Sequence, residues 1–376
     1  MLTIGHTLGD GFVSFHLVLM PLLAERLGFT MAAAGVVSGI ARMTSAIGQP
    51  LLGHLCERRD QRRYLLVGLA LTIVGSGLLG LSWDYWSVLA FMTVAMLGVA
   101  AYHPVGATLA SHAAGSRRGT VMSAYASAGN FGVMLAPALL GFAVGAWGIG
   151  VTVWAIPIGA AILVPVALSL RSPAEQRAGG TALGDGPTRK GSFGKLVVHM
   201  TMRTAAITGF VTYLPFYFQR TLGFQERYVG LGLAFFTLSG VIGTFVAGHV
   251  SDTRSRKPIL VWSTLISIPF MVGFLLTGGV LSMCLMAAGS AFLWAGHTVN
   301  VVLGQEMLPR NPSLASGITL GLTWGAGSLL LPAWGWIADV YGPWLSLLIL
   351  AATFPALASL SALFLNDTEK PRKATA

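Results

Sequence analysis

The sequence predicts an all-α membrane protein of twelve transmembrane helices in two six-helix bundles, and three observations predict it. The 376 residues are 54% hydrophobic and 10% charged, whereas a soluble globular domain carries about 25% charged residues. Glycine contributes 48 residues, and small residues allow membrane helices to pack closely. Apolar runs of about 20 residues, the length that crosses a bilayer, recur along the chain. This composition excludes a secreted disulfide scaffold, a disordered tail protein and a two-domain cytosolic enzyme.

The apolar runs and the polar breaks between them give the order of elements. The first run contains Asp10 and has no small-residue cleavage site, so we interpret it as a retained helix and not as a signal peptide. One long polar stretch separates the first six runs from the last six and is predicted to be a cytoplasmic linker. We therefore expect an N-terminal bundle at 1–170, the linker at 171–195, a C-terminal bundle at 196–366 and a cytoplasmic tail at 367–376. The twelve expected helices span 2–24, 31–54, 64–82, 86–111, 119–146, 149–170, 196–219, 228–250, 258–278, 280–304, 314–338 and 344–365.

Basic residues are distributed unevenly between the two sides of the predicted membrane. Eighteen of the 23 Lys and Arg residues fall in the even-numbered loops and the C-terminal tail, three fall in the odd-numbered loops, and Arg42 and Arg203 lie inside helices. Because cytoplasmic loops are enriched in Lys and Arg, we expect both termini on the cytoplasmic side of the cell (inner) membrane. The same loops account for the net charge of +10, since they lie beside anionic membrane lipid. We therefore expect no nucleic-acid partner.

A short motif repeats at half the chain length. Residues 53–59 read Gly-His-Leu-Cys-Glu-Arg-Arg, and residues 248–254, which begin 195 residues later, read Gly-His-Val-Ser-Asp-Thr-Arg. Each copy ends the second helix of its half and opens a basic loop. Two parallel six-helix repeats joined by a cytoplasmic linker describe the architecture of the major facilitator superfamily.

The second copy continues to residue 258 and is close to that superfamily's loop signature, G-x-x-x-D-x-x-x-R-[KR], whereas the first copy has Glu57 in place of Asp. Segments in both halves resemble the fosmidomycin-resistance type of drug exporter within the superfamily. The resemblance implies proton-driven efflux of a small compound, which in that family is a phosphonate antibiotic. These segments are His-Thr-Leu-Gly-Asp at 6–10, Gln-Pro-Leu-Leu-Gly at 49–53, Tyr-His-Pro at 102–104, Gly-Asn-Phe-Gly at 129–132 with Ala-Pro at 136–137, Gln-Glu-Met-Leu-Pro at 305–309 and Gly-Trp-Ile-Ala-Asp at 335–339.

Two positions depart from what the resemblance implies. Val94 stands near the place where many drug–proton antiporters have an arginine in the fourth helix, and Arg42 stands where a neutral polar residue is expected. Both departures weaken the transfer of a substrate from the family to this chain.

Three residues are the candidates for proton coupling. Asp10 lies about 12 Å into the first helix at 1.5 Å per residue, and an acid at that depth is a functional hypothesis by default. His6 is four residues earlier on the same helix face, and a histidine beside an acid can load and release a proton in the physiological range. His103 precedes Pro104 in the fourth helix, which lines the central path in this architecture. The alternatives are a structural His6–Asp10 pair and a buried, satisfied His103.

Four residues are the candidates for substrate binding. Arg203 in the seventh helix and Arg42 in the second each carry a guanidinium. This group can bind a carboxylate, phosphate or phosphonate in a bidentate manner, through two parallel hydrogen bonds. Arg42 has the alternative of pairing with an acid such as Asp10, and Arg203 that of reaching the cytoplasmic surface along its stem. His297 and Asn300 lie three residues apart on one face of the tenth helix.

Loop charges and a glycine pattern complete the candidate sites. The loop residues are predicted to gate and orient the two halves, and the fifth-helix residues resemble an antiporter signature, with ordinary small-residue packing as the alternative. The gating candidates are Glu57, Arg58, Asp252, Arg254, Arg256 and Glu306, and the fifth-helix residues are Gly129, Asn130, Gly132 and Pro137.

The sequence therefore predicts a secondary active transporter and not an enzyme. Its predicted activity is proton-coupled efflux of a small polar or anionic antimicrobial-like compound by alternating access. The alternatives are a proton symporter that takes up an organic anion or nutrient, and, more remotely, a non-transporting membrane receptor or scaffold. We expect no cofactor and no metal, with the proton gradient as the energy source. The expected partners are a small-molecule substrate, protons and membrane lipid, and the protein is expected to act as a monomer.

Overall fold

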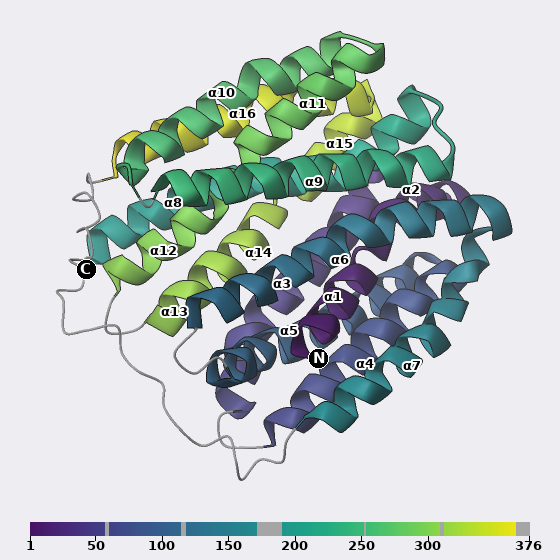
Figure 1. Cartoon of the computed structure of the whole chain (residues 1–376). Helices are drawn as coiled ribbons and strands as arrows, with labels where there is room; N and C mark the ends of the chain where they lie inside the picture. The colour runs from purple at the N-terminus through teal and green to yellow at the C-terminus, as the bar shows by residue number, and fades with distance from the viewer. Residues whose placement is uncertain (57–59, 114–117, 171–189, 252, 309–311, 366–376) are drawn as a thin grey trace. The chain divides into compact units, whose positions relative to one another are not determined.

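The computed structural model describes residues 1–56, 60–113, 118–170, 190–251, 253–308 and 312–365, and these residues form helices with no strand among them (Figure 1). Ten of the helical runs are long and apolar enough to cross a membrane. The expected runs 196–219 and 314–338 are also helical. The first lies in a helix that carries His199 and Arg203, and the second is divided into short helices between residues 312 and 341.

The chain divides into two compact units. Unit 1 comprises Met1–Gly180 with Pro215–Ala234, and unit 2 comprises Thr181–Leu214 with Phe235–Ala376. Residues 215–234 therefore group with the N-terminal part, whereas the sequence predicts a division at the linker. Close backbone contact explains this grouping, because a Cβ atom at Gly230 would collide with the carbonyl oxygen of Pro137.

Unit 1 is an all-helical bundle. Its helices are α1 (Leu2–Val13), α2 (Phe15–Leu27), α3 (Met31–Cys56), α4 (Gln61–Leu78), η1 (Leu79–Leu81), α5 (Tyr85–Ala113), α6 (Arg118–Trp147), η3 (Ile149–Trp154), α7 (Ala155–Ser169) and the π-helical turn η5 (Tyr217–Thr221).

Unit 2 is helical as well. Two helices, α8 (Lys190–Phe216) and α9 (Glu226–Ser251), have one end in each unit. The remaining helices are α10 (Arg256–Leu276), α11 (Gly279–Trp294), α12 (His297–Met307), α13 (Pro312–Gly317), the π-helical turn η6 (Ile318–Leu322), α14 (Thr323–Ser328), α15 (Leu331–Tyr341) and α16 (Pro343–Leu363).

Helix α1 packs against α4, α5, α6 and α7, among which it lies in Figure 1. Its glycines allow this close approach. A Cβ atom at Gly9 would overlap the ring of Tyr102 on α5, and one at Gly11 would lie 3.4 Å from Ala136 Cβ on α6. The absence of side chains at these points brings the polar residues of α1 within reach of α5 and α6.

Two of the breaks in the expected membrane runs bear on the polar residues. The first run is divided at Ser14, whose backbone N–H and Oγ both donate to the Gly11 carbonyl oxygen, at 3.2 and 2.7 Å. The expected run 280–304 is divided between Trp294 and His297, where α11 ends and α12 begins. Breaks within membrane helices expose backbone polar groups, so they occur where protein or a cavity can satisfy those groups.

Candidate functional site

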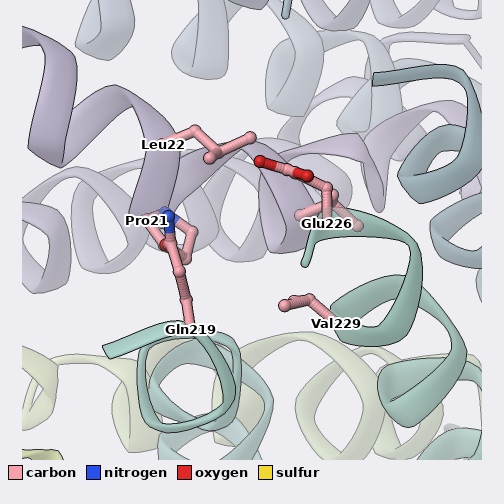
Figure 2. A pocket seen from close by; sticks show the side chains of 6 residues that line it. Pro21, Leu22, Gln219, Glu226 and Val229 are labelled. Carbon is pink, nitrogen blue, oxygen red and sulfur yellow. The ribbon is translucent and has the colours of Figure 1, made fainter. Parts of the chain in front are cut away.

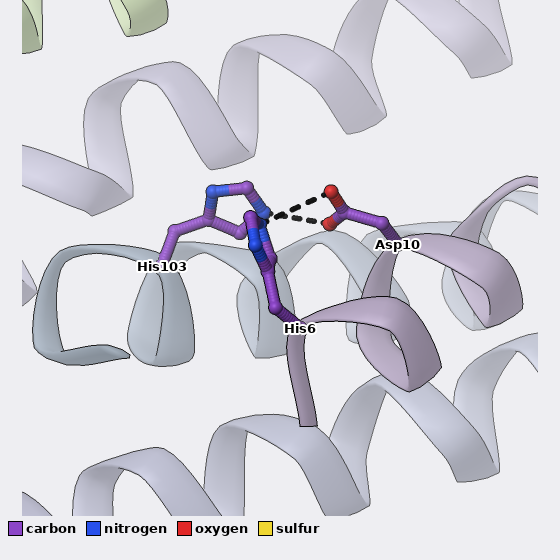
Figure 3. A group of neighbouring side chains, drawn as sticks. All are labelled: His6, Asp10 and His103. Carbon is purple, nitrogen blue, oxygen red and sulfur yellow. Dashed lines mark hydrogen bonds and ion pairs between the residues drawn. The ribbon is translucent and has the colours of Figure 1, made fainter. Parts of the chain in front are cut away.

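His6, Asp10 and His103 lie together inside unit 1 (Figure 3). The two histidine Nε2 atoms approach opposite oxygens of one carboxylate, His6 at 3.2 Å from Oδ2 and His103 at 2.8 Å from Oδ1. The i, i+4 spacing of α1 sets the first contact, and the packing of α1 on α5 sets the second. Side-chain exposure rises from 8% for His6 through 15% for Asp10 to 30% for His103. The cluster is therefore buried at one end and accessible at the other.

The hydrogen bonds around His6 require a proton between His6 and Asp10. The carbonyl oxygen of Tyr125 can only accept, so the His6 Nδ1 atom 2.7 Å away carries a hydrogen and donates it. The remaining nitrogen, Nε2, faces Asp10 Oδ2. A bare imidazole lone pair would repel a carboxylate there. We therefore assign a second proton to this pair, on the imidazole or on the carboxyl group.

Neighbouring groups hold the cluster in place. The hydroxyl of Tyr102 donates a hydrogen bond to Asp10 Oδ1, and the ring of Tyr125 stacks on the His6 imidazole with centroids 4.1 Å apart. Two nitrogens and a carboxylate oxygen, all within 4.8 Å of one another, would also be donor atoms for a metal ion. Tyr102 and His103 both contact Oδ1, so a metal ion bound at Oδ1 would break the hydrogen bonds that this oxygen now accepts.

The fifth-helix glycines lie directly against this cluster. A Cβ atom at Gly129 would collide with Asp10 Oδ2 and would lie 2.6 Å from Cε1 of His6. Gly132 packs closely on α1 as well. A Cβ atom built on Gly132 would lie 2.9 Å from the backbone nitrogen of Gly11. Asn130 is half-buried, and Pro137 lies inside α6. The glycines of the antiporter-like pattern therefore provide the close packing that the cluster needs.

A second polar cluster lies in unit 2 around Arg203. This side chain is 2% exposed. Its Nη atoms make two long hydrogen bonds, 3.4 Å to Ser263 Oγ and 3.3 Å to the Phe292 carbonyl oxygen. No acid within the described residues forms an ion pair with it, and its Nε atom has no partner there. Arg203 is therefore a buried residue and does not extend to the surface.

His199 completes this second cluster, and the sequence analysis missed it. Its Nδ1 atom lies 2.8 Å from the Ala358 carbonyl oxygen, as His6 Nδ1 does from that of Tyr125. His199, Arg203 and His297 follow His6, Asp10 and His103 by 193, 193 and 194 residues. The spacing nearly equals that of the loop repeat, which is the signal that identifies His199. Both histidines of this cluster, His199 and His297, lie within electrostatic range of the Arg203 guanidinium.

The structure does not pair Arg42 with Asp10. The recorded partners of Asp10 are the two histidines and Tyr102, and Arg42 instead lies within electrostatic range of His16 on α2. Within the described residues, the Nε atom of Arg42 is buried without a hydrogen-bond partner. The expected pairing of Arg42 with Asp10 is therefore wrong, because His6, Tyr102 and His103 occupy the Asp10 carboxylate.

His297 and Asn300 lie at the start of α12. The His297 ring contacts Trp294 and Trp324, with centroids at 6.3 and 5.7 Å. Asn300 is 1% exposed, and its Oδ1 atom has no hydrogen-bond partner among the residues described. Both residues therefore belong to the surroundings of the helix break beside Arg203.

The gating candidates are described only in part. Arg256 Nη1 forms an ion pair with Glu306 Oε2, which joins the start of α10 to the end of α12. Arg254 is exposed. Glu57, Arg58 and Asp252 lie outside the described residues.

Unit 1 also has a recess lined by residues of α2, η5 and α9 (Figure 2). Its polar residues are Gln219 and Glu226, and no histidine or arginine lines it. The remaining lining is apolar, so we do not assign a proton or an anion to it. The recess is formed by Val18, Pro21, Leu22, Gln219, Glu226 and Val229.

Comparisons with known proteins identify the family. The Major Facilitator Superfamily profile matches residues 2–318. The uncharacterized MFS-type transporter YfnC of Bacillus subtilis is 26% identical over 98% of this chain and 92% of its own length. The fosmidomycin resistance protein of Escherichia coli is 26% identical over 90% and 85% of the two chains.

Solved structures show the same fold. A bacterial homologue of the human lysosomal transporter Spinster, inward-facing and unoccupied, has a TM-score of 0.77 at 15% identity, covering 96% of each chain. The inward-open xylose transporter XylE of E. coli has a TM-score of 0.75 at 16% identity, covering 98% of this chain and 96% of its own. These likenesses confirm the predicted twelve-helix fold class and the family resemblance. The family profile and the two relatives confirm the prediction of a multi-pass membrane transporter and not an enzyme. The chain belongs to the Major Facilitator Superfamily.

Proposed function

We propose that this transporter exports a small polar or anionic antimicrobial-like compound in exchange for protons. The observation that carries the proposal is the His6–Asp10–His103 cluster, in which one carboxylate holds two imidazoles at 3.2 and 2.8 Å. An acid inside the membrane region is expensive and marks a proton or substrate pathway. Since the hydrogen bonds already require one proton within the pair of His6 and Asp10, the cluster can release it when the surroundings change.

Proton release is coupled to transport through alternating access. The cluster joins α1 to α5 and is enclosed by Gly129 of α6, so a change in how these helices pack changes the distances that hold the proton. A proton bound more tightly in one conformation than in the other shifts the population between them. The proton gradient is then the sole energy source, and the proposal requires no cofactor.

The substrate side of the proposal rests on the second cluster. Arg203 is a permanent positive charge, and a buried charge needs a counter-charge. The relative named for fosmidomycin resistance supports an antimicrobial compound as the cargo. We propose Arg203, His297 and Asn300 as substrate contacts in unit 2, with Arg42 as a further candidate in unit 1.

Orientation and gating follow the loop charges. We propose that both termini lie in the cytoplasm, because 18 of the 23 basic residues fall on that side. The Arg256–Glu306 ion pair, at the cytoplasmic end in this orientation, would open and close as the transporter changes conformation. We propose that the monomer is the functional unit.

Everted membrane vesicles with an acidic interior test the proposal. Export by antiport would carry an added compound into the vesicle and protons out, so a trapped fluorescent weak base reports the loss of acidity. The compounds to add are fosmidomycin, a carboxylic acid and a cationic drug. We expect a response to one of the two anions with the wild type and none with Asp10→Asn, at membrane levels matched by immunoblot.

Two results would contradict the proposal. A response of equal size in Asp10→Asn would remove the cluster from proton coupling. Silence in everted vesicles, together with acid-driven uptake in right-side-out vesicles, would make the protein a symporter.

A further inference from the structure

A two-residue turn, Ala295 and Gly296, separates α11 from α12 in unit 2. Helix α12 spans eleven residues from His297, and its N-cap is Gly296, with no side-chain hydrogen bond to the cap. The first N–H groups of a helix have no intrahelical partner, and the helix dipole makes this end partly positive. Broken membrane helices use such ends to bind anionic groups.

The Arg203 guanidinium lies against the same point. A Cβ atom at Gly296 would collide with Arg203 Nη1 and would lie 2.8 Å from its Cζ atom. Arg203 is 2% exposed, its two hydrogen bonds are 3.3 and 3.4 Å long, and its Nε atom has no partner among the described residues. The guanidinium therefore lies at the start of α12, and no described acid forms an ion pair with Arg203.

Three aromatic rings in unit 2 form a cluster at the break, from Trp294 on α11, His297 on α12 and Trp324 on α14. Trp294, His297 and Trp324 contact one another, with centroids 5.7 to 6.3 Å apart. Trp324 and His297 are partly exposed, whereas Trp294 is buried. This aromatic cluster, defined by the three rings, offers an apolar surface beside a fixed positive charge.

We propose that the helix break binds an organic acid, with its carboxylate on Arg203 and the α12 N-terminus and its apolar ring against the aromatic cluster. The Nε–H and one Nη–H of a guanidinium form a planar fork that fits both oxygens of a carboxylate. The inference rests on the proposed function in taking the bound acid as the cargo. Binding itself needs no proton gradient, so it can be measured when transport fails.

Calorimetric titration of the purified full-length protein in detergent tests the site with three probes. Benzoate supplies charge and ring, acetate supplies charge alone, and benzamide supplies the ring alone. For the wild type we expect benzoate to bind about tenfold more tightly than acetate, because the ring adds aromatic contact. Benzamide should bind at least about tenfold more weakly than benzoate, because it has no charge.

Substitutions separate the two parts of the site. In Arg203→Gln, benzoate affinity should fall roughly tenfold to hundredfold, to the level of benzamide. In Trp324→Leu, benzoate should lose its advantage over acetate while acetate affinity stays unchanged. The matched controls are Arg227→Gln and Trp262→Leu, both at exposed positions, and both should bind benzoate as the wild type does.

Three results would overturn the proposal. Equal benzoate affinity in wild type and Arg203→Gln would exclude the arginine, and equal affinities for acetate and benzoate in wild type would exclude the aromatic cluster. Absence of benzoate binding to the wild type would exclude the site. If Arg203→Gln aggregates during size-exclusion chromatography, Gly296→Ala is tested in its place. A benzoate affinity of Gly296→Ala equal to that of the wild type would also contradict the proposal.

Binding and transport failures can be distinguished. Benzoate binding that follows this pattern without any proton response in vesicles would contradict the proposed antiport and leave the acid site standing. A proton response in vesicles, with benzoate affinity unchanged in Arg203→Gln, would contradict the acid site and leave the proposed antiport standing.

Discussion

The two polar clusters share a framework and differ in one residue. In unit 1, His6 on α1 donates to a backbone carbonyl and faces Asp10 four residues later, with His103 completing the set. In unit 2, His199 on α8 contacts a backbone carbonyl in the same way, but the residue four positions later is Arg203. A group that can gain or lose a proton is thus replaced by one that stays charged.

This difference underlies our proposal that unit 1 couples to protons and unit 2 binds an anion. A carboxylate flanked by two imidazoles can hold a variable number of protons, whereas a guanidinium between histidines keeps a constant positive charge. The first arrangement suits coupling to a proton gradient, and the second suits holding an anion. Asp10 and Arg203 occupy equivalent positions in the two repeats. The replacement of an acid by an arginine at this position is therefore the main chemical difference between the two clusters.

The largest effect should follow from removing the acid of the first cluster. Asp10→Asn keeps the shape but cannot exchange a proton, so gradient-driven accumulation of substrate should be abolished. Exchange of labelled for unlabelled substrate, which needs no net proton movement, should persist in reconstituted vesicles. Glu25→Gln, at an exposed acid of the same unit, is the control. Accumulation at the wild-type rate in Asp10→Asn would mean that the two clusters do not differ in proton coupling.

The equivalent histidines give the next comparison. His6→Gln removes a partner of Asp10, and loss of a hydrogen bond to a charged group costs about 1.5–3 kcal/mol, so proton-driven transport should fall roughly tenfold to hundredfold. His199→Gln alters the cluster that has no acid, and the number of protons moved per substrate should stay unchanged. Proton and substrate fluxes measured together check both. A changed ratio in His199→Gln would contradict the proposed difference between the units.

A glycine substitution should have a smaller effect on the same cluster. In Gly129→Ala, the added Cβ atom overlaps Asp10 Oδ2 and crowds the His6 ring. Overpacking of this kind costs about 1–3 kcal/mol, so we expect transport to fall about tenfold. Gly194→Ala is the control, because a Cβ atom there has no neighbour within 4 Å. Equal rates in the two variants would show that the cluster tolerates displacement from α6.

The membrane helices were predictable from composition, and their breaks were not. Apolar runs of membrane length located α3, α6 and α10 because a span must satisfy its backbone within the helix. The break at Ala295 and Gly296 leaves the hydropathy unchanged, since both residues are small and apolar. At this break Gly296 lies against Arg203, a contact between residues distant in sequence.

The first cluster was predictable where spacing was sufficient. His6 and Asp10 share a helix face by their separation alone, and His103 was expected on the same path from the family resemblance. Tyr102 and Tyr125 were missed because their contacts join different helices. His199 was missed because an imidazole near the end of an expected run carries no local sign of burial. Alignment of the two halves at the 193-residue spacing recovers it.

The smallest effect is expected at the ion pair between Arg256 and Glu306. Both residues belong to unit 2, and the Glu306 side chain is 51% exposed. Solvent weakens such a pair to about 0.2–1 kcal/mol, so Glu306→Gln should change turnover by at most about fivefold. Substrate affinity should stay unchanged, because the pair lies outside both polar clusters. The turnover of Glu306→Gln is compared with that of Arg254→Gln, which changes an exposed arginine just before α10. The double variant Arg256→Gln with Glu306→Gln should have the same turnover as the single variant Glu306→Gln. A loss of affinity with normal turnover would place the pair in substrate binding. Glu306 would then be an acid of the anion site that we propose in unit 2.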